Sequence, residues 1–189
     1  MKRGKLLIIS GASAGVGKDT LVKLFLTKHP EWEKPASVVT RKPRPGEVNG
    51  VDYYFVGQST FDKWVKNNDF LETDFHASHW YGTLRKPIED LLSRGRDIIL
   101  RKDVNGSLKI KQRIPGAILV YIDVESHDVL ESRIRARSSE TAETEEQIQE
   151  RLKLAKKEQK FKEHFDYVII NAHNRPEEAV EAIEKAAGV

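Results

Sequence analysis

The 189-residue sequence has no cysteine, which excludes disulfides and thiolate metal sites. No apolar run approaches the roughly 20 residues of a membrane-spanning helix, and the basic start, residues 1–5, precedes only about five apolar residues, too few for a secretory signal. Net charge is small, since 32 lysines and arginines against 29 acidic residues give +3, too little to indicate nonspecific nucleic-acid binding. We therefore expect a cytoplasmic protein with no nucleic-acid or membrane partner.

The sequence does contain an alternation of short apolar runs and helical patterns. Strands are predicted at residues 5–10, 97–100, 117–122 and 167–171, and helices at residues 20–28, 87–94, 127–137, 144–163 and from 176 onward. This alternation favours an α/β fold in which helices cover both faces of a parallel sheet. A chain of this length with 39% hydrophobic residues can bury one core, so we expect one domain.

Two stretches interrupt this alternation. Residues 37–83 are rich in proline, glycine and aromatic residues, and their short alternating segments predict an inserted mixed subdomain. Residues 133–151 are rich in charges of both signs within a helical pattern. From composition alone, the simplest interpretation of this second stretch is a solvated helix face.

A phosphate-binding loop is predicted between the first strand and the first helix. Residues 11–20 read Gly-Ala-Ser-Ala-Gly-Val-Gly-Lys-Asp-Thr, and such glycines let backbone N–H groups point at phosphate oxygens while Lys18 reaches the β and γ phosphates. Ala12 stands where the motif has its first glycine, and Asp19 stands where Ser or Thr usually binds Mg²⁺. The predicted triphosphate ligands are Ser13, Ala14, Gly15, Val16, Gly17, Lys18, Asp19 and Thr20, with Asp19 and Thr20 also as Mg²⁺ ligands.

A second phosphate site is predicted in the interrupted region. Arg41 and Arg44 lie three residues apart on a proline-stiffened loop, and Tyr53 follows. Arginine binds phosphate in a bidentate manner, and a tyrosine hydroxyl can add a hydrogen bond, so this loop is a candidate clamp for a monophosphate. A basic surface loop is the alternative that these residues alone leave open.

Residues 37–55 closely resemble the GMP-binding signature of guanylate kinases. The Phe-Leu-Glu run at 70–72 and the Trp-Tyr-Gly-Thr run at 80–83 resemble the second acceptor-binding segment of that family, and the resemblance covers essentially the whole chain. It implies ATP-dependent phosphorylation of GMP, and of dGMP more weakly, with Mg²⁺ as cofactor. It also implies a three-layer P-loop kinase core (residues 1–35, 88–130 and 156–189), a GMP-binding insert (36–87) and a small helical lid (131–155).

The resemblance assigns roles to single residues of the acceptor site. The GMP phosphate is assigned to Ser37, Arg41, Arg44, Tyr53 and Tyr81, and the guanine to Glu72, Thr83 and Asp103. The chemistry agrees, because guanine presents N1–H and N2–H₂ as donors on one edge and a carboxylate can accept both. An ordinary exposed acid is the alternative for Glu72 and for Asp103.

On the donor side, the resemblance assigns Arg137 and Arg151 of the lid to the transferring phosphates, as catalytic residues together with Lys18 and Arg41. It places Arg133 and Asn171 near ATP, and for Asn171 a turn residue at a strand end is the alternative. The lid is longer here than is usual in the family, so the alignment of Arg151 is firmer than that of Arg137. The oligomeric state is expected to be a monomer or a homodimer.

Arg101 departs from the family, which usually has an acidic residue two positions before Asp103. Relative to the family, the chain therefore gains a carboxylate at Asp19 and loses one at Arg101. We hypothesise that the two side chains pair, which would preserve the local charge near the metal. Two unrelated substitutions that point apart are the alternative.

Two other functions fit parts of the sequence. The Gly-Lys-Asp order in the phosphate loop also resembles ribose 1,5-bisphosphate phosphokinases, but that family is not expected to carry a full GMP signature. A noncatalytic guanylate-kinase-like binding module is the other alternative, and an intact Gly17 and Lys18 argue against it.

Overall fold

The computed structural model describes residues 2–12, 15–76, 78–141 and 143–189. Its core is a parallel sheet with the strand order β6-β1-β7-β8. The strands are β1 (Leu6–Gly11), β6 (Ile98–Arg101), β7 (Ile118–Asp123) and β8 (Tyr167–Ile170). Each matches a strand that the sequence predicts, to within one residue at either end.

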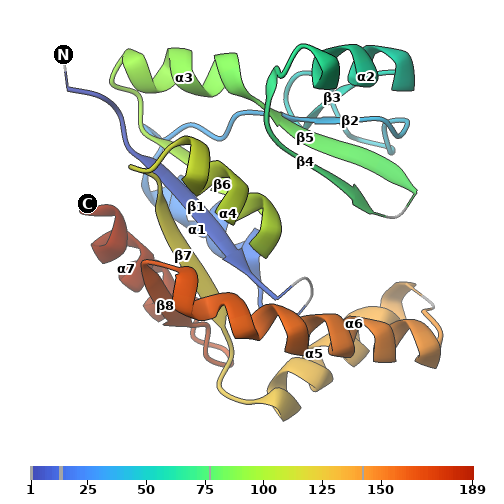
Figure 1. The fold of residues 1–189 in the computed structure, drawn as a ribbon. Coiled ribbons are helices and arrows are strands. Elements are labelled where there is room, and N and C mark those ends of the chain that lie inside the picture. The colour runs from blue at the N-terminus through green and yellow to red at the C-terminus, as the bar shows by residue number, and fades with distance from the viewer. Residues whose placement is uncertain (1, 13–14, 77, 142) are drawn as a thin grey trace.

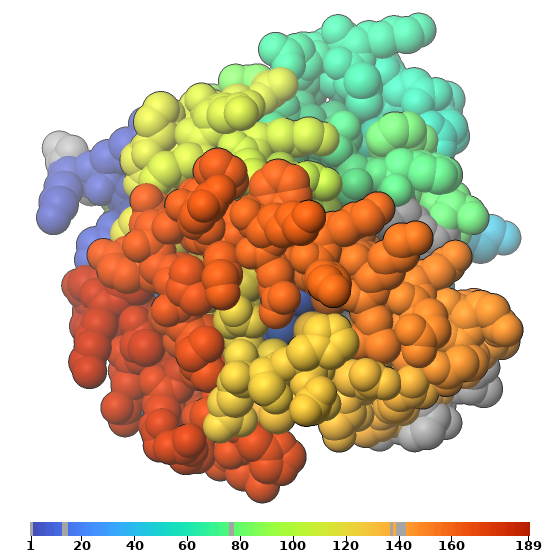
Figure 2. All heavy atoms as spheres, turned by 60° about the horizontal axis from the view of Figure 1, so that its bottom comes forward, coloured from blue at the N-terminus to red at the C-terminus, as the bar shows by residue number. Residues whose placement is uncertain are grey.

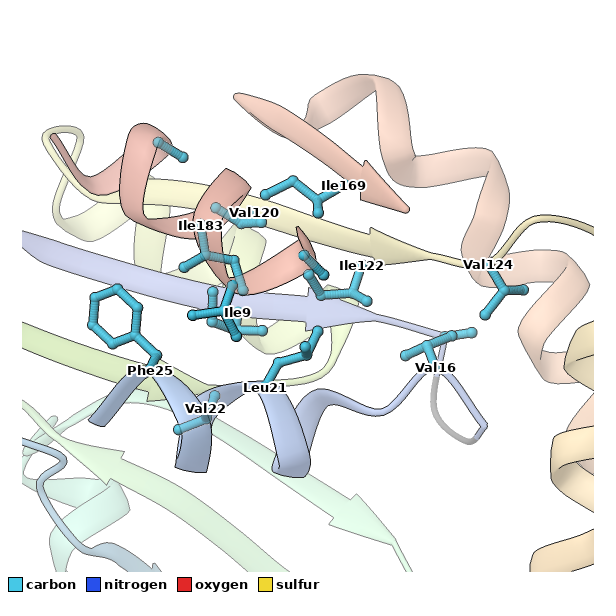
Figure 3. Close-up of a cluster of buried hydrophobic side chains, with 14 of the residues drawn as sticks. Ile9, Val16, Leu21, Val22, Phe25, Val120, Ile122, Val124, Ile169 and Ile183 are labelled. Atoms are coloured by element: carbon cyan, nitrogen blue, oxygen red, sulfur yellow. The ribbon is translucent and has the colours of Figure 1, made fainter. Parts of the chain in front are cut away.

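Helices cover both faces of this sheet. They are α1 (Lys18–Lys28), α3 (Arg85–Ser93), α4 (Val104–Arg113) and α7 (Pro176–Ala187). Every residue of β1 is buried, because Leu7 and Ile9 face α1 and α7 while Leu6 and Ile8 face α3 and α4. Figure 3 shows the first of these clusters around Ile9. The predicted three-layer α/β fold is therefore confirmed.

Helix α4 is missing from the sequence prediction, although it lies directly behind the candidate site. Its first residues, Val-Asn-Gly-Ser, have weak helix propensity. The helix forms because Asp103 caps it by accepting a hydrogen bond from the Gly106 N–H at 2.6 Å, and because Val104 and Ile110 are buried against the core sheet.

A second, mixed sheet has the strand order β3-β2-β5-β4 and is called the insert sheet below. It consists of β2 (Ser37–Val39), β3 (Tyr53–Phe55), β4 (Phe70–His76) and β5 (His79–Leu84), and helix α2 (Gln58–Lys66) packs on it. Its buried cluster is small: Val38, Phe61 and Phe70, with Trp64 and Trp80 partly buried beside them. The sequence predicts the mixed character of this region but not α2.

Two helices, α5 (His127–Thr141) and α6 (Glu145–Glu158), form an antiparallel pair, and a 3₁₀ helix, η1 (Gln159–His164), follows. The single helix predicted at 144–163 thus ends early, at Glu158. A capping box between Thr144 and Gln147 begins α6. Arg135 ties the pair together by bonding Glu131 of α5 and Glu145 of α6.

Figure 1 shows the insert sheet and the α5–α6 pair on the same side of the molecule, with the carboxyl end of β1 between them. In Figure 2, segments of α5 and α6 flank an opening in which N-terminal atoms, coloured blue, are visible. The exact limits of core, insert and lid stay a prediction. Among the described residues, no helix has both the length and the apolar character needed to cross a membrane.

Candidate active site

The phosphate loop joins the end of β1 to the start of α1. Gly15 and Gly17 have positive φ, 79° and 81°, a conformation that favours glycine, and Gly17 is the N-cap of α1. The Lys18 ammonium lies inside the loop and donates to the carbonyl oxygens of Gly11 and Ala12. Burial lowers the pKa of Lys18 to about 8. The predicted ligands Ser13 and Ala14 lie outside the described residues.

Asn171 supports this loop from the end of β8. Its side chain is buried, and the Nδ2 amide donates to the carbonyl oxygen of Val16 at 2.9 Å. A Cβ atom on Gly17 would come within 2.5 Å of the same Nδ2. Arg133 donates in turn to the Asn171 carbonyl oxygen at 3.1 Å. The structure therefore brings both predicted ATP-site residues to the loop, and their contact with ATP itself stays a prediction.

Asp19 and Arg101 face each other, as hypothesised. The Arg101 Nε lies 2.9 Å from the Asp19 Oδ1, which links the first turn of α1 to the end of β6. The alternative, in which the two side chains point apart, is thereby excluded. The Asp19 side chain is 73% exposed and the Arg101 side chain 38% exposed, so the pair lies at the rim of the loop. Thr20, which follows, is also exposed.

Glu72 and Thr83 are brought together by a β-bulge. The register of β4 against β5 shifts between Phe70 and Glu72, so that Glu72 lies directly opposite Thr83. The Thr83 hydroxyl donates to the Glu72 Oε1 at 2.5 Å. Because the Glu72 side chain is only 4% exposed, the alternative of an ordinary exposed acid is wrong.

A lysine that sequence reasoning missed also contacts Glu72. The Lys102 Nζ lies 3.0 Å from the Glu72 Oε1 and donates to the Ser37 Oγ at 3.0 Å. The sequence signal that could have indicated Lys102 is its position between Arg101 and Asp103, two residues already singled out. Nothing in the sequence indicates that its side chain crosses from the core to the insert sheet.

Asp103 lies beside Glu72 as well as capping α4. Burial raises the pKa of the Asp103 carboxyl group, and the charges of Asp74 and Glu72 act in the same direction, against the bond from the Gly106 N–H. A Cβ atom on Gly106 would come within 2.8 Å of the Asp103 Oδ1 and 3.3 Å of the Glu72 Oε2. The first turn of α4 thus lies directly against both predicted guanine-binding acids.

At the other end of the acceptor site, Arg41 makes a bidentate ion pair with Glu47, with both N–O distances at 2.6 Å. The Arg41 guanidinium lies over the rings of Tyr53 and Phe55, 5.2 and 5.6 Å from their centroids. Glu47 also accepts from the Arg44 backbone N–H at 2.7 Å, and Arg41 lowers the pKa of Glu47 to about 2. Glu47 is a second residue that sequence reasoning did not single out.

The remaining acceptor residues lie around this ion pair. Tyr53 and Tyr81 pack edge to face, with ring centroids 6.2 Å apart, and Ser37 begins the neighbouring strand β2. Arg44 is exposed on the loop. The structure therefore brings Arg41, Tyr53 and Tyr81 together. Ser37 lies nearer the Glu72–Thr83 pair, because its hydroxyl accepts from the same Lys102 ammonium that contacts Glu72.

In the α5–α6 pair, Arg151 of α6 pairs with Glu143 at 2.6 Å, and Glu143 also accepts from the Ser138 hydroxyl at 2.8 Å. Arg151 is therefore held by a carboxylate of its own segment. Arg137 belongs to α5, but its side chain lies outside the described part of the structure. The roles of both arginines in transfer stay predictions.

Comparison with known proteins gives consistent results. The guanylate kinase family model matches residues 3–187. The guanylate kinase of Gloeobacter violaceus is 38% identical over 181 residues, which cover 96% of this chain and 85% of the relative. That of Thermus thermophilus is 41% identical over 169 residues, which cover 89% and 74%. The crystal structure of the Anaplasma phagocytophilum guanylate kinase matches with a TM-score of 0.75 at 28% identity and covers 99% of this chain and 86% of that chain.

Proposed function

The chain belongs to the guanylate kinase family, and we propose that it transfers the γ-phosphoryl group of ATP to GMP. The observation that carries this proposal is the buried carboxylate of Glu72, fixed opposite Thr83 in the same small sheet that holds Arg41 over two aromatic rings. A carboxylate suits the donor edge of guanine, and a fixed guanidinium suits a monophosphate. GMP has the guanine donor edge at one end and the monophosphate at the other.

At the donor end, the loop supplies positioning and charge. The Lys18 ammonium lies at the N-terminus of α1, where backbone N–H groups and the helix dipole also attract phosphate. When ATP enters, its phosphate oxygens replace the Gly11 and Ala12 carbonyls as partners of the ammonium. Asn171 keeps the loop in shape through its bond to Val16.

At the acceptor end, the phosphate of GMP replaces Glu47 as a partner of Arg41. Arg44, Tyr53, Tyr81 and Ser37 add further donors around it. Phosphoryl transfer requires alignment, neutralisation of charge and exclusion of water rather than a covalent intermediate. Arg137 and Arg151 of the α5–α6 pair are proposed to supply charge to the transferring group when the pair closes over the nucleotides.

Mg²⁺ is the proposed cofactor. It prefers oxygen ligands and is usually held by one or two protein groups together with substrate phosphates and water. The Asp19 carboxylate and the Thr20 hydroxyl fit this requirement, because both lie in the first turn of α1 directly after Lys18. When bound, the metal would neutralise charge on the β and γ phosphates. The pair with Arg101 would then fix the Asp19 carboxylate at the edge of the metal site.

The two alternative functions are less well supported. A ribose bisphosphate has no pair of N–H donors to match the buried Glu72, and burial of an unmatched carboxylate is unfavourable. A noncatalytic module would not need a lysine held inside a phosphate loop. We further propose a cytoplasmic monomer or homodimer that acts on free nucleotides and needs no nucleic-acid or membrane partner.

An acceptor panel tests the proposal. The purified protein is assayed with ATP and Mg²⁺ against GMP, dGMP, AMP, UMP and ribose 1,5-bisphosphate, and GMP is expected to be the best acceptor, with dGMP weaker. Lys18→Ala should remove nearly all turnover while the protein stays folded, because the lysine acts on phosphate charge. AMP phosphorylated as fast as GMP, or near-normal turnover by the Lys18 variant, would overturn the assignment.

A further inference from the structure

Lys102 connects the core to the insert sheet at the base-reading carboxylate. It follows the last residue of β6, and its backbone N–H donates to the Ile9 carbonyl oxygen of β1, which anchors it to the core sheet. Its side chain then reaches Glu72 on β4 and Ser37 on β2. The Lys102 side chain is 10% exposed and the Glu72 side chain 4% exposed, so the contact is largely shielded from water.

The acceptor sites of Glu72 can be counted. An ionised carboxylate offers about four lone-pair sites. The Thr83 hydroxyl and the Lys102 ammonium both lie at Oε1 and take two of these sites. About two remain, which equals the number of donors, N1–H and one N2–H, on the edge of guanine. Adenine presents one donor, on N6, beside one acceptor, N1. A lone pair of the carboxylate would therefore oppose the lone pair of N1.

Thr83 and Lys102 constrain the Oε1 atom of Glu72 in different ways. A hydroxyl both donates and accepts, so Thr83 alone would not fix Oε1 as an acceptor. An ammonium has three donors and no acceptor, so Lys102 requires Oε1 to be an acceptor.

We propose that Lys102 is a specificity-determining positioning residue, whose ammonium holds Glu72 as an oriented carboxylate and thereby sets the preference for guanine over adenine. The inference rests on the proposed function, since it concerns the acceptor of the same reaction. Lys102 acts through Glu72 and is not a group that touches the reacting phosphates. It is a lysine of this chain that the sequence signature of the acceptor site does not include.

Lys102 is the base that reaches the Glu72 carboxylate. The acids near Glu72 are Asp74 of β4 and Asp103 at the start of α4. Among the bases of α4, Lys111 pairs with Asp166, whereas Lys109 and Arg113 donate to the backbone carbonyl oxygens of Thr73 and Phe70.

The first experiment compares acceptor selectivity. Values of kcat/KM for GMP and for AMP are measured at saturating ATP for the wild type, Lys102→Met, Lys102→Gln and Lys102→Arg. We expect the GMP/AMP ratio to fall by about tenfold or more in the Met and Gln variants. The Arg variant should keep most of the ratio, because a guanidinium also only donates.

Lys109→Met is the matched control. This lysine bonds β4 at the Thr73 carbonyl oxygen but does not reach the Glu72 carboxylate, so its loss should leave the ratio unchanged. Loss of activity toward GMP and AMP in equal proportion in the Lys102 variants would overturn the inference. If Lys102→Met does not fold, the comparison of Gln with Arg decides, since both are polar but only arginine keeps the positive charge.

A second experiment has a readout other than activity. GMP binding and AMP binding are each measured by calorimetry in the absence of ATP. Lys102→Gln should weaken GMP binding about tenfold relative to AMP binding, because the Glu72 carboxylate loses the cation that orients it. In a Glu72→Gln background this effect of Lys102→Gln should vanish, and its persistence would overturn the inference.

These outcomes separate the two proposals. Wild-type protein that phosphorylates no nucleoside monophosphate would overturn the proposed function, and the calorimetric comparison of GMP with AMP would still test Lys102. Wild-type protein that prefers GMP, with the same preference in every Lys102 variant, would overturn only the inference.

Discussion

In the proposed acceptor site, Arg41 is held by Glu47, a partner that GMP would have to replace. Its guanidinium is bound by Glu47 at two short distances and stacked over Tyr53 and Phe55, so it is already oriented before GMP arrives. Pre-orientation of this kind reduces the entropy that binding must overcome. Glu47 is therefore expected to matter for GMP binding although it repels phosphate.

Arg41→Ala should raise the KM for GMP about ten- to a hundredfold and leave the KM for ATP nearly unchanged. A charge-assisted bond to the acceptor is worth roughly 1.5–3 kcal/mol, which corresponds to this range. Steady-state kinetics with each substrate varied in turn is the measurement. Arg96→Ala, which removes an exposed arginine paired with Glu33, is the control. Equal effects on both KM values would show that Arg41 does not bind the acceptor.

Asp103→Asn should raise the melting temperature at pH 7. Burial raises the folded-state pKa of Asp103 above its ordinary value of 3.8, so its ionisation disfavours the folded state at neutral pH. The asparagine Oδ1 still caps α4, and the gain should shrink as the pH falls through the raised folded-state pKa and vanish only below 3.8, where the aspartate is neutral in both states. Thermal unfolding against pH measures this, with the exposed Asp90→Asn as control.

The same substitution should weaken GMP binding if Asp103 reads guanine, since the variant loses a negative charge beside N2–H₂. A variant that is more stable but binds GMP less well would be a stability–activity compromise. If the melting temperature did not rise at pH 7, the prediction that the ionised Asp103 destabilises the folded protein would be wrong.

At the scale of secondary-structure elements, the sequence predicts what depends on local pattern and misses what depends on partners. Apolar runs revealed the four core strands, because strands buried on both faces, such as β1 and β7, are continuous in hydrophobicity, and the edge strand β8 keeps an apolar run although it is mostly exposed. Helix α4 was not predicted, because Gly106 and its polar neighbours are weak helix formers. The helix is stabilised by the Asp103 cap and by contacts with the core, which no local sequence pattern reveals. The bulge at Leu71, which aligns Glu72 with Thr83, has no sequence signal of its own.

The candidate site divides in the same way. The signature around Arg41 and the Glu72 and Thr83 positions could be predicted from resemblance. The partners Glu47 and Lys102 could not, because each is recognised only by the contact that it makes. The Asp19–Arg101 pair is intermediate: two departures from the family pattern, on elements that meet at one sheet edge, suggested a contact that the structure confirms.

The Asp19–Arg101 pair links α1 to β6, and substitution of both residues tests its role. Arg101→Glu should place a second carboxylate beside Asp19 and lower kcat/KM for ATP, whereas adding Asp19→Ser, which removes the first carboxylate, should restore much of the loss. The pair is well exposed, so its net contribution to stability is only about 0–1 kcal/mol, and melting temperatures should change little.

The measurement is the Mg²⁺ dependence of ATP turnover in both single variants and in the double variant. The effects should be non-additive, because the two side chains are in contact. Strictly additive effects on turnover would show that the pairing is irrelevant to catalysis.

At the scale of the whole molecule, two sheets of unequal stability share one chain. Strands β1, β6 and β7 of the core sheet are largely buried between two apolar clusters, whereas the described part of the insert sheet is stabilised by a small cluster of Val38, Phe61 and Phe70. Regions with few buried apolar contacts open at lower free energy than the global unfolding transition. The acceptor site is therefore built on the less stable part.

Native-state hydrogen exchange should resolve this difference. Amides of β2 and β3 are expected to exchange faster than amides of β1 and β7, and GMP should slow exchange in the insert sheet, whereas ATP should act mainly at the β1–α1 junction. Uniform protection of both sheets in the empty protein would contradict this expectation.

The attachment of β4 has a mechanical consequence. Strand β4 is held at three points. Lys102, which precedes α4, contacts Glu72, and Lys109 and Arg113 of α4 bond the carbonyl oxygens of Thr73 and Phe70. Because β4 is one edge of the insert sheet and β3 the other, three strand spacings of about 4.8 Å, or about 14 Å, separate them. If the insert sheet rotated inward about β4, a rotation of about 10° would move the end of the sheet at Tyr53 by about 2–3 Å. Guanine would then stay near the rotation axis, while the phosphate of GMP would move toward ATP.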